Sequence, residues 1–184
     1  MIIRTLLCIA ILIAIGVGQV RADDAAPGPA ADVPELKLLS QFAGHWDSEL
    51  GVNAPGETTG AKTTGKTECQ WILDGRFLRQ SWSIQPAKGI PAMKGQSIRT
   101  YDPQKKKFVA WTFHSSGYTE TATGEWDEKA KAFNWMADLP QYQWTTETRS
   151  AFPKEGYEEW SIVTKNRQGK VIIDLKGKAM RRTE

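Results

Sequence analysis

The chain has 184 residues, and its 24 lysines and arginines nearly balance its 21 aspartates and glutamates. This balance gives no reason to expect a nucleic-acid partner, because nucleic-acid-binding proteins concentrate positive charge against phosphates. Cys8 lies in a predicted signal peptide, so the mature chain would keep only Cys69 and two histidines, which cannot build a closed structural zinc site at any familiar spacing. There is also no glycine-rich phosphate loop and no nucleophile elbow. The sequence therefore predicts no metal and no cofactor.

Residues 1–22 have the features of a secretory signal peptide. Arg4 gives a short basic start, Leu6 to Val17 is an unbroken apolar run, and Val20-Arg21-Ala22 supplies the small residues of a cleavage site. The apolar run is too short to span a bilayer comfortably. We therefore expect an exported protein, periplasmic or extracellular, with no membrane span after cleavage. Cleavage would leave 22 basic against 21 acidic residues, a net charge of about +1.

Residues 23–33, "DDAAPGPAADV", are small, acidic and contain proline, which predicts a disordered tether. A single folded domain is expected over residues 34–184. Pro34 is suited to the first position of a helix, and Leu36, Leu39 and Phe42 then fall on one helix face. This pattern predicts a short helix that plugs or flanks the rest of the domain.

The clearest β-hairpin signal is "TECQWILDGRFLRQSW", residues 67–82. Asp74-Gly75 is a two-residue turn that matches the twist of paired strands. The turn predicts a register that pairs Trp71 with Leu78, Cys69 with Gln80 and Thr67 with Trp82. The face that these residues share is apolar and is expected to point inward. Cys69 is therefore expected to be a small buried side chain and not a reactive thiol.

Hairpins of this kind continue to the end of the chain. Alternating segments separated by turns rich in Gly, Pro, Asp and Asn predict about ten strands, at 45–51, 67–73, 76–82, 95–102, 107–114, 118–127, 132–139, 143–152, 157–165 and 170–180. No helical segment interrupts them. A long antiparallel meander most often protects its edges by closing on itself. The sequence predicts an all-β fold, an up-and-down antiparallel barrel wide enough for a small ligand.

The two histidines differ in their predicted orientation. His45 alternates with Trp46, so if the tryptophan points inward the histidine faces water. His114 ends the segment "KFVAWTFH", in which both faces are partly apolar, so its orientation stays open. A polar position at the mouth of the barrel fits His114 best.

Several stretches together resemble a bacterial family known as domain of unknown function 1579. They are "LLSQFAGHWDSE", "ECQWILDGRFLRQSW", "YDPQKKKFVAWTF", "ATGEWDEKAKAF" and "KGKAMRR", which span about residues 36–182 in the family's order. The resemblance implies a calycin-type, lipocalin-like barrel and no established activity. The chain departs from the family's pattern at Thr100, where members often have glycine, and at Phe113 and His114, where members often carry an acid.

A more distant resemblance is to nitrobindin-type haem barrels. Their early Gly-x-Trp motif is half present, as Gly44-His45-Trp46. Their haem-ligating histidine lies late in the chain, and no histidine follows His114 here. Haem ligation by that family's route is therefore not expected.

Eight tryptophans follow the predicted signal peptide, and each carries a large apolar surface with one N–H group. The residues predicted to line the interior are Trp46, Trp71, Trp82, Trp111, Trp135, Trp144 and His114. The favoured function is a non-enzymatic barrel that binds a small, largely apolar molecule. Three alternatives stay open: a filled core with no ligand, an enzyme that uses His114 with Tyr118 or an inward carboxylate as acid and base, and haem binding through His45 or His114. The sequence specifies neither the ligand nor the oligomeric state.

Overall fold

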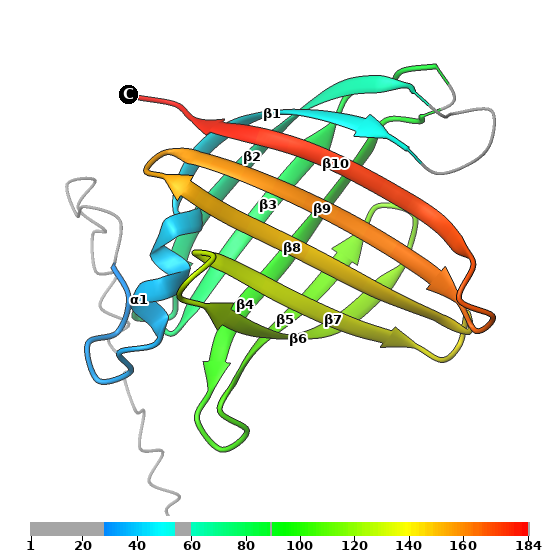
Figure 1. Cartoon of the computed structure of the whole chain (residues 1–184). Helices are drawn as coiled ribbons and strands as arrows, with labels where there is room; N and C mark the ends of the chain where they lie inside the picture. The colour runs from blue at the N-terminus through cyan, green and yellow to red at the C-terminus, as the bar shows by residue number, and fades with distance from the viewer. Residues whose placement is uncertain (1–27, 54–59, 89, 184) are drawn as a thin grey trace, which may run out of the picture.

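Ten antiparallel strands close into one barrel in the computed structural model (Figure 1). The structure describes residues 28–53, 60–88 and 90–183, so the predicted signal peptide lies outside the described residues. The strands are β1 (Gly44–Val52), β2 (Lys62–Ile72), β3 (Phe77–Ile84), β4 (Met93–Asp102), β5 (Lys107–His114), β6 (Thr119–Asp127), β7 (Ala132–Leu139), β8 (Trp144–Lys154), β9 (Tyr157–Asn166) and β10 (Val171–Arg181). Each strand pairs with its neighbours in sequence, and β1 also pairs with β10. The predicted fold class is confirmed.

The register of the β2–β3 hairpin is the predicted one, with Trp71 opposite Leu78 and Thr67 opposite Trp82. The turn that sets this register requires left-handed backbone, with φ of 55° at Asp74 and 77° at Gly75. A short polar residue followed by glycine tolerates this conformation best. The inward-facing set of the hairpin therefore follows directly from its turn.

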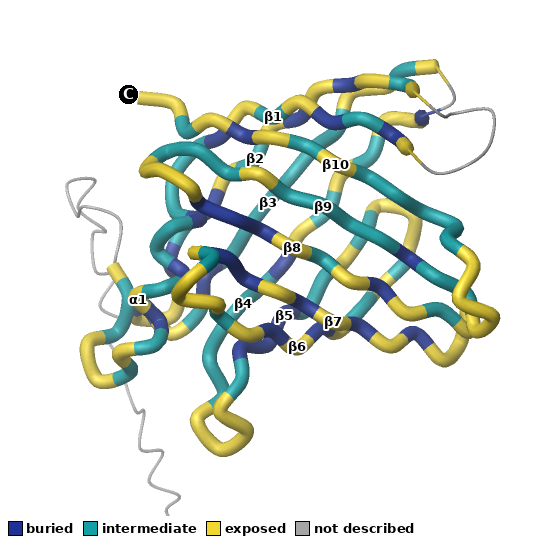
Figure 2. Tube along the Cα trace, in the orientation of Figure 1, coloured by how far each residue is buried: buried dark blue, intermediate teal, exposed yellow. Residues whose placement is uncertain are grey.

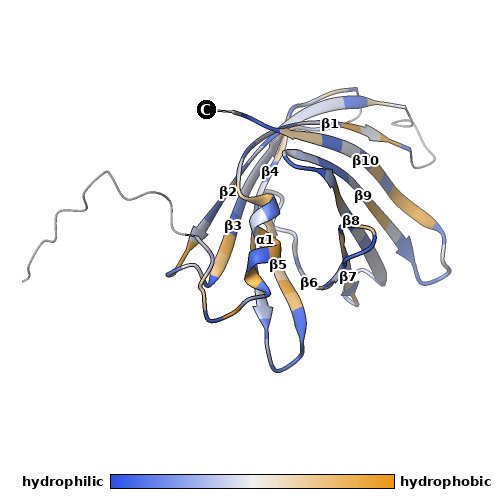
Figure 3. Ribbon diagram, turned by 60° about the vertical axis from the view of Figure 1, so that its left-hand side comes forward, coloured by the Kyte–Doolittle hydropathy of each residue, from blue (hydrophilic) through white to orange (hydrophobic). Residues whose placement is uncertain are grey.

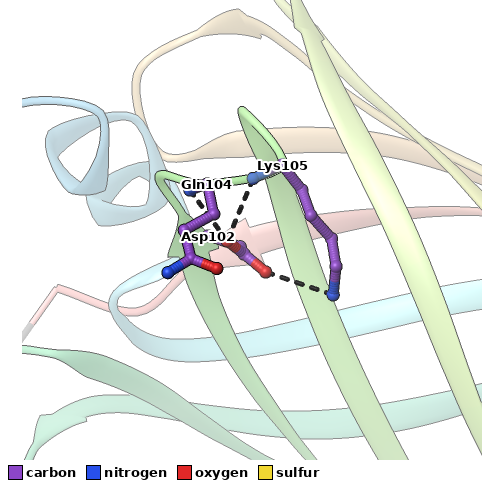
Figure 4. Close-up of polar contacts among 3 residues, drawn as sticks. All are labelled: Asp102, Gln104 and Lys105. Atoms are coloured by element: carbon purple, nitrogen blue, oxygen red, sulfur yellow. Dashed lines mark hydrogen bonds and ion pairs between the residues drawn. The ribbon is translucent and has the colours of Figure 1, made fainter.

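Another turn, between β4 and β5, is held by the Asp102 carboxylate (Figure 4). This carboxylate accepts hydrogen bonds from the backbone N–H groups of Gln104 at 3.0 Å and Lys105 at 3.1 Å, and it lies 3.2 Å from the Lys105 Nζ atom. These contacts lower the pKa of Asp102. An aspartate whose carboxylate accepts hydrogen bonds from the N–H groups two and three residues later stabilises a turn. The segment "DPQKKK" therefore contains the side chain that stabilises its own turn.

One end of the barrel is closed by a short helical segment, α1 (Leu36–Leu39) followed by the 3-10 turn η1 (Ser40–Phe42). In Figure 3 the helix stands in front of the ring of strands, between β3 and β7–β8. Leu36, Leu39 and Phe42 are at most 2% exposed and pack into the main core. The indole N–H of Trp46 donates to the Phe42 carbonyl at 2.7 Å, which ties the plug to β1. The predicted helix is confirmed, and it plugs the barrel.

Residues 28–33 are not a free tether, and this part of the prediction is wrong. The Ala30 N–H donates to the Gly75 carbonyl at 3.0 Å, and Asp32 forms an ion pair with Arg76 at 2.7 Å. Ala30 and Val33 also pack against the core. The segment is ordered because it docks on the β2–β3 turn, a partner that local composition does not reveal.

Candidate functional site

The inside of the barrel has two parts with different packing. Beside the helical plug, large side chains fill the space: Trp71, Leu78, Phe108, Phe133 and Phe152 are all at most 5% exposed. We call this part the filled half. In Figure 2 the longest buried run of β8 lies toward its C-terminal end, whereas along β7 buried and exposed residues alternate over most of the strand.

The other part, which we call the open half, lies toward the far ends of the strands. Several of its inward-facing side chains keep part of their surface accessible to water, although they point into a closed ring of strands, while others such as Leu50, Ala137 and Thr164 are buried. The accessible ones are Thr67, Gln80, Trp82, Ile84, Thr112, His114, Thr148, Trp160, Ile162, Ile173 and Leu175. Water therefore reaches the inside of this half.

Three tryptophans lie against the inner wall over glycines on the neighbouring strand. Trp82 faces Gly95, Trp135 faces Gly124 and Trp160 faces Gly177 as direct cross-strand partners. A Cβ atom added to the glycine would lie 2.8 Å from Cε2 of Trp82, 2.7 Å from Cδ2 of Trp135 and 2.5 Å from Cε2 of Trp160. Glycine in a strand often marks such a close approach. The three indoles therefore lie close against the neighbouring strand.

The predicted lining residues divide between the two halves. Trp46 and Trp71 face inward but belong to the filled half, at 2% and 5% exposure. Trp135 is 5% exposed and stacks on Phe133, with ring centroids 5.5 Å apart, so it too is core. Trp82 lies in the open half, and Trp144 lies at its rim, where it stacks on Tyr142 at 5.2 Å. Only two of the six predicted tryptophans therefore face the accessible interior.

Trp111 is on the outer wall, so its predicted place in the lining is wrong. It alternates along β5 with Phe108 and Ala110, which face inward, and it pairs with Ile98 and Thr121 on the outer face. His114 shares the inner face with Phe108. Because both faces of β5 are apolar, alternation alone did not decide which one points inward.

Three charged side chains and one tryptophan of the interior were missed: Arg99, Glu158, Trp160 and Arg181, which pairs with Trp46. Arg99 pairs with Leu78 and Ala110 on inward-facing positions, and Glu158 pairs with Ala179. Trp160 follows Glu158 on the same face. Extending the hairpin registers from Leu78 across β4 would have placed Arg99 inside, but charged residues are usually assigned to the surface.

Arg99 lies at the boundary between the filled and the open half. Its guanidinium carbon is 4.4 Å from the centre of the Phe42 ring and 5.6 Å from that of Trp135. Its Nη1 atom is buried and has no hydrogen-bond partner. Burial lowers the pKa of Arg99, while Cys69 and Glu158 act to raise it. An arginine remains charged in proteins even so. A full positive charge with one unused donor therefore faces the interior.

Glu158 is the interior carboxyl whose charge affects the pKa of Arg99. Burial raises its pKa, and a hydrogen bond with Ser150 and the charge of Arg99 act to lower it. Among the described residues Glu158 forms no ion pair with Arg99. The carboxyl is thus easier to protonate than an exposed one, and it neutralises Arg99 only in part.

The Cys69 thiol belongs to the same buried layer, as predicted for a small buried side chain. Burial raises its pKa to about 12, and Cys69 is 4% exposed. Because the thiolate is the reactive form, we expect iodoacetamide to leave Cys69 unmodified in the folded protein near neutral pH and to modify it after denaturation. Peptide mass spectrometry measures this. Rapid modification of Cys69 in the folded protein would contradict the described burial.

His114, Tyr118 and Glu120 converge at the mouth of the open half. The His114 ring lies 4.8 Å from that of Tyr118 and 5.1 Å from that of Trp82. The Tyr118 hydroxyl donates to Glu120 at 2.9 Å. Burial raises the pKa of Tyr118, and Glu120 adds to the rise. The predicted place of His114 at the barrel mouth is confirmed.

The pKa of His114 gives a testable pH dependence. Burial lowers this pKa from 6.5, and Glu120 partly opposes the shift. The unfolded chain therefore binds the proton more readily, so His114 should cost stability as the pH falls through 6.5. We expect the free energy of unfolding to fall less between about pH 8 and about pH 5 in His114→Gln than in the wild type. Equal pH dependence in both proteins would show that His114 is not shielded from water.

His45 faces outward, as its alternation with Trp46 predicts. It pairs with Glu68 on β2, and its carbonyl accepts a hydrogen bond from the Arg182 N–H at 2.7 Å. A ligand inside the barrel therefore has no access to this side chain. His114 is the histidine that faces the interior.

The larger of the surface grooves, of about 810 Å³, crosses β1, β2 and β8–β10. Charged side chains such as Lys62 and Lys176 line it together with Leu50 and Trp160. Lys178 and Glu49 at its edge form an ion pair at 3.3 Å.

The described residues contain no group of three or more side chains suited to hold a metal ion. No helix within the described ranges is long and apolar enough to cross a membrane. These two findings add no further site to the interior.

Comparison with known proteins places the chain in a family. A family model described as a protein of unknown function, DUF1579, matches residues 32–170. The chain belongs to the DUF1579 family. No curated protein matches it.

Among solved structures, this DUF1579 protein is similar to the S-type phycobiliprotein lyase CPES from Guillardia theta. The two share 12% identity with a TM-score of 0.58, over 80% of this chain and 92% of the lyase chain. At this identity the likeness concerns the fold, a lipocalin-like barrel. The resemblance to the family and to a lipocalin-like barrel is confirmed.

Proposed function

We propose that this DUF1579 protein binds one small, largely apolar molecule inside the open half of its barrel. The observation that carries the proposal is the placement of Trp82 and Trp160 over Gly95 and Gly177. Indoles held against the wall present their faces to the interior. Concave sites lined by aromatic side chains with a few polar groups are typical of small-molecule binding.

The alternative of a filled core fits only one half of the barrel. A filled core would bury every inward-facing side chain, as it does around Phe42 and Phe133. Trp160, Ile162 and Leu175 instead keep accessible surface although they face inward. Covering exposed apolar surface of this kind with a ligand removes it from water, which favours binding. The apolar run at residues 6–17 supports export, so the ligand would be met outside the cytoplasm.

The test is a fluorescence titration with the neutral probe phenylnaphthylamine. Thr148 is half-buried and faces inward on β8, whereas Thr145 is exposed and faces outward on the same strand. Thr148→Trp places an indole in the open half and should weaken probe binding about tenfold or more. Thr145→Trp adds the same group outside and should leave binding unchanged. Equal binding by the two variants, with circular dichroism confirming that both fold, would overturn the proposal.

A further inference from the structure

Arg99 places a positive charge at the boundary where the open half meets the filled half. We call this boundary the floor of the open half. The Arg99 guanidinium lies against Phe42 on its filled side, and its buried Nη1 atom has no hydrogen-bond partner. A buried donor without a partner costs free energy unless another group accepts its hydrogen bond. The unused donor thus marks a place where an acceptor is expected.

The other interior arginine, Arg181, also has a buried Nε atom without a hydrogen-bond partner, but its guanidinium binds the plug. Arg181 donates through Nη2 to the Gln41 carbonyl at 2.8 Å, and its guanidinium carbon lies 4.8 Å from the Trp46 ring centre. Arg181 therefore holds the helical segment in place. Arg99 is the arginine that lies between the plug and the accessible half.

The charges around Arg99 favour an anion over a neutral group. Arg99 and Arg181 are both cations, and Glu158 is the one carboxyl that acts on Arg99 among the described residues. Glu158 forms no ion pair there, and its own buried position favours the neutral form. The floor therefore carries net positive charge. Hydrogen bonds between a guanidinium and an anionic oxygen are about twice as strong as those between neutral groups.

We propose that the ligand is an amphiphile with one anionic group, a carboxylate or sulfonate, which Arg99 binds at the floor while the apolar body lies along Trp82. This inference rests on the proposed function and adds the chemical class of the ligand. Gly95, which Trp82 covers, is four residues from Arg99 on β4, a distance of about 13 Å along the strand. A body of two or three rings, or a medium-length alkyl chain, matches this distance.

The experiment compares two probes that share one ring skeleton, neutral phenylnaphthylamine and anionic anilinonaphthalene sulfonate. Each probe is titrated into the full chain as wild type, Arg99→Gln and Arg149→Gln. Arg149 is exposed on the outer wall and serves as the matched control. We expect Arg99→Gln to weaken sulfonate binding about tenfold or more and to leave the neutral probe within about twofold. Arg149→Gln should change neither.

The outcomes separate the two proposals. If the wild type binds the neutral probe but Arg99→Gln binds the sulfonate as tightly as the wild type does, the anion site is wrong and the proposed function stands. If neither probe binds to the wild type, the proposed function fails, and this inference fails with it. Competition in the wild type keeps the test valid if Arg99→Gln does not fold. Decanoate should then displace the neutral probe at a concentration about tenfold lower than decanol does, and equal potency would overturn the inference.

Discussion

Replacing Phe42 with alanine is expected to lower the free energy of unfolding by about 3–5 kcal/mol, the range typical for removal of a buried aromatic ring. Phe42 is 2% exposed and joins the plug to the barrel. Its ring centroid lies 5.4 Å from that of Phe133 and 4.9 Å from that of Phe152. The ring also covers the Arg99 guanidinium. Its loss leaves a cavity and exposes a charge that the plug now shields.

Denaturant unfolding followed by tryptophan fluorescence measures this change. The matched control is Phe113→Ala, because Phe113 is 48% exposed on the outer wall of β5. Surface substitutions of this kind usually change stability by no more than about 0.5 kcal/mol. A similar, small effect of both substitutions would mean that the helical segment does not close the barrel as described.

Replacing Gly124 with alanine is the second large effect that we expect, a loss of about 1–3 kcal/mol from overpacking. The added methyl group would lie 2.7 Å from Cδ2 of Trp135. Trp135 cannot move aside, because it is 5% exposed and packs against Phe133 and Phe108. The same unfolding measurement applies.

The control for Gly124→Ala is Gly51→Ala on β1. The nearest atom to an added Cβ there is the Ala61 carbonyl oxygen, at an ordinary 3.8 Å. Alanine in a strand loses less backbone entropy on folding than glycine, so this variant should be neutral or more stable by up to about 1 kcal/mol. Opposite signs for the two variants are the expected result. Equal effects would argue that the indole does not lie over Gly124.

Much of the fold followed from local chemistry in the sequence. The Asp74-Gly75 turn fixed one register correctly, and period-two alternation found all ten strands. The spacing of Leu36, Leu39 and Phe42 found the helical plug. These features depend on residues close in the chain, and turn geometry transmits them across each hairpin.

The candidate site was harder to predict, because it depends on which face of each strand points inward. Trp111 and His114 lie on opposite faces of β5, and the apolar character of both faces concealed this. Arg99 was missed because a charged residue inside a barrel contradicts the usual pattern. Its position becomes clear only when the pairings of β3, β4 and β5 are combined.

The pairing of each interior tryptophan with a glycine is also a property of the assembled barrel. Gly95, Gly124 and Gly177 lie within strands, so turn chemistry gives them no role. In register, each stands directly opposite a tryptophan. The space inside the open half therefore depends on cross-strand partners and not on the number of tryptophans.

A crystal structure with bromonaphthoate bound would show where a ligand lies, because bromine is located by its anomalous scattering. We expect one bromine peak inside the open half, close to Trp82 and Trp160, with the carboxylate directed toward Arg99. Bromine peaks confined to the outer wall, with protein side chains filling the open half, would contradict this expectation.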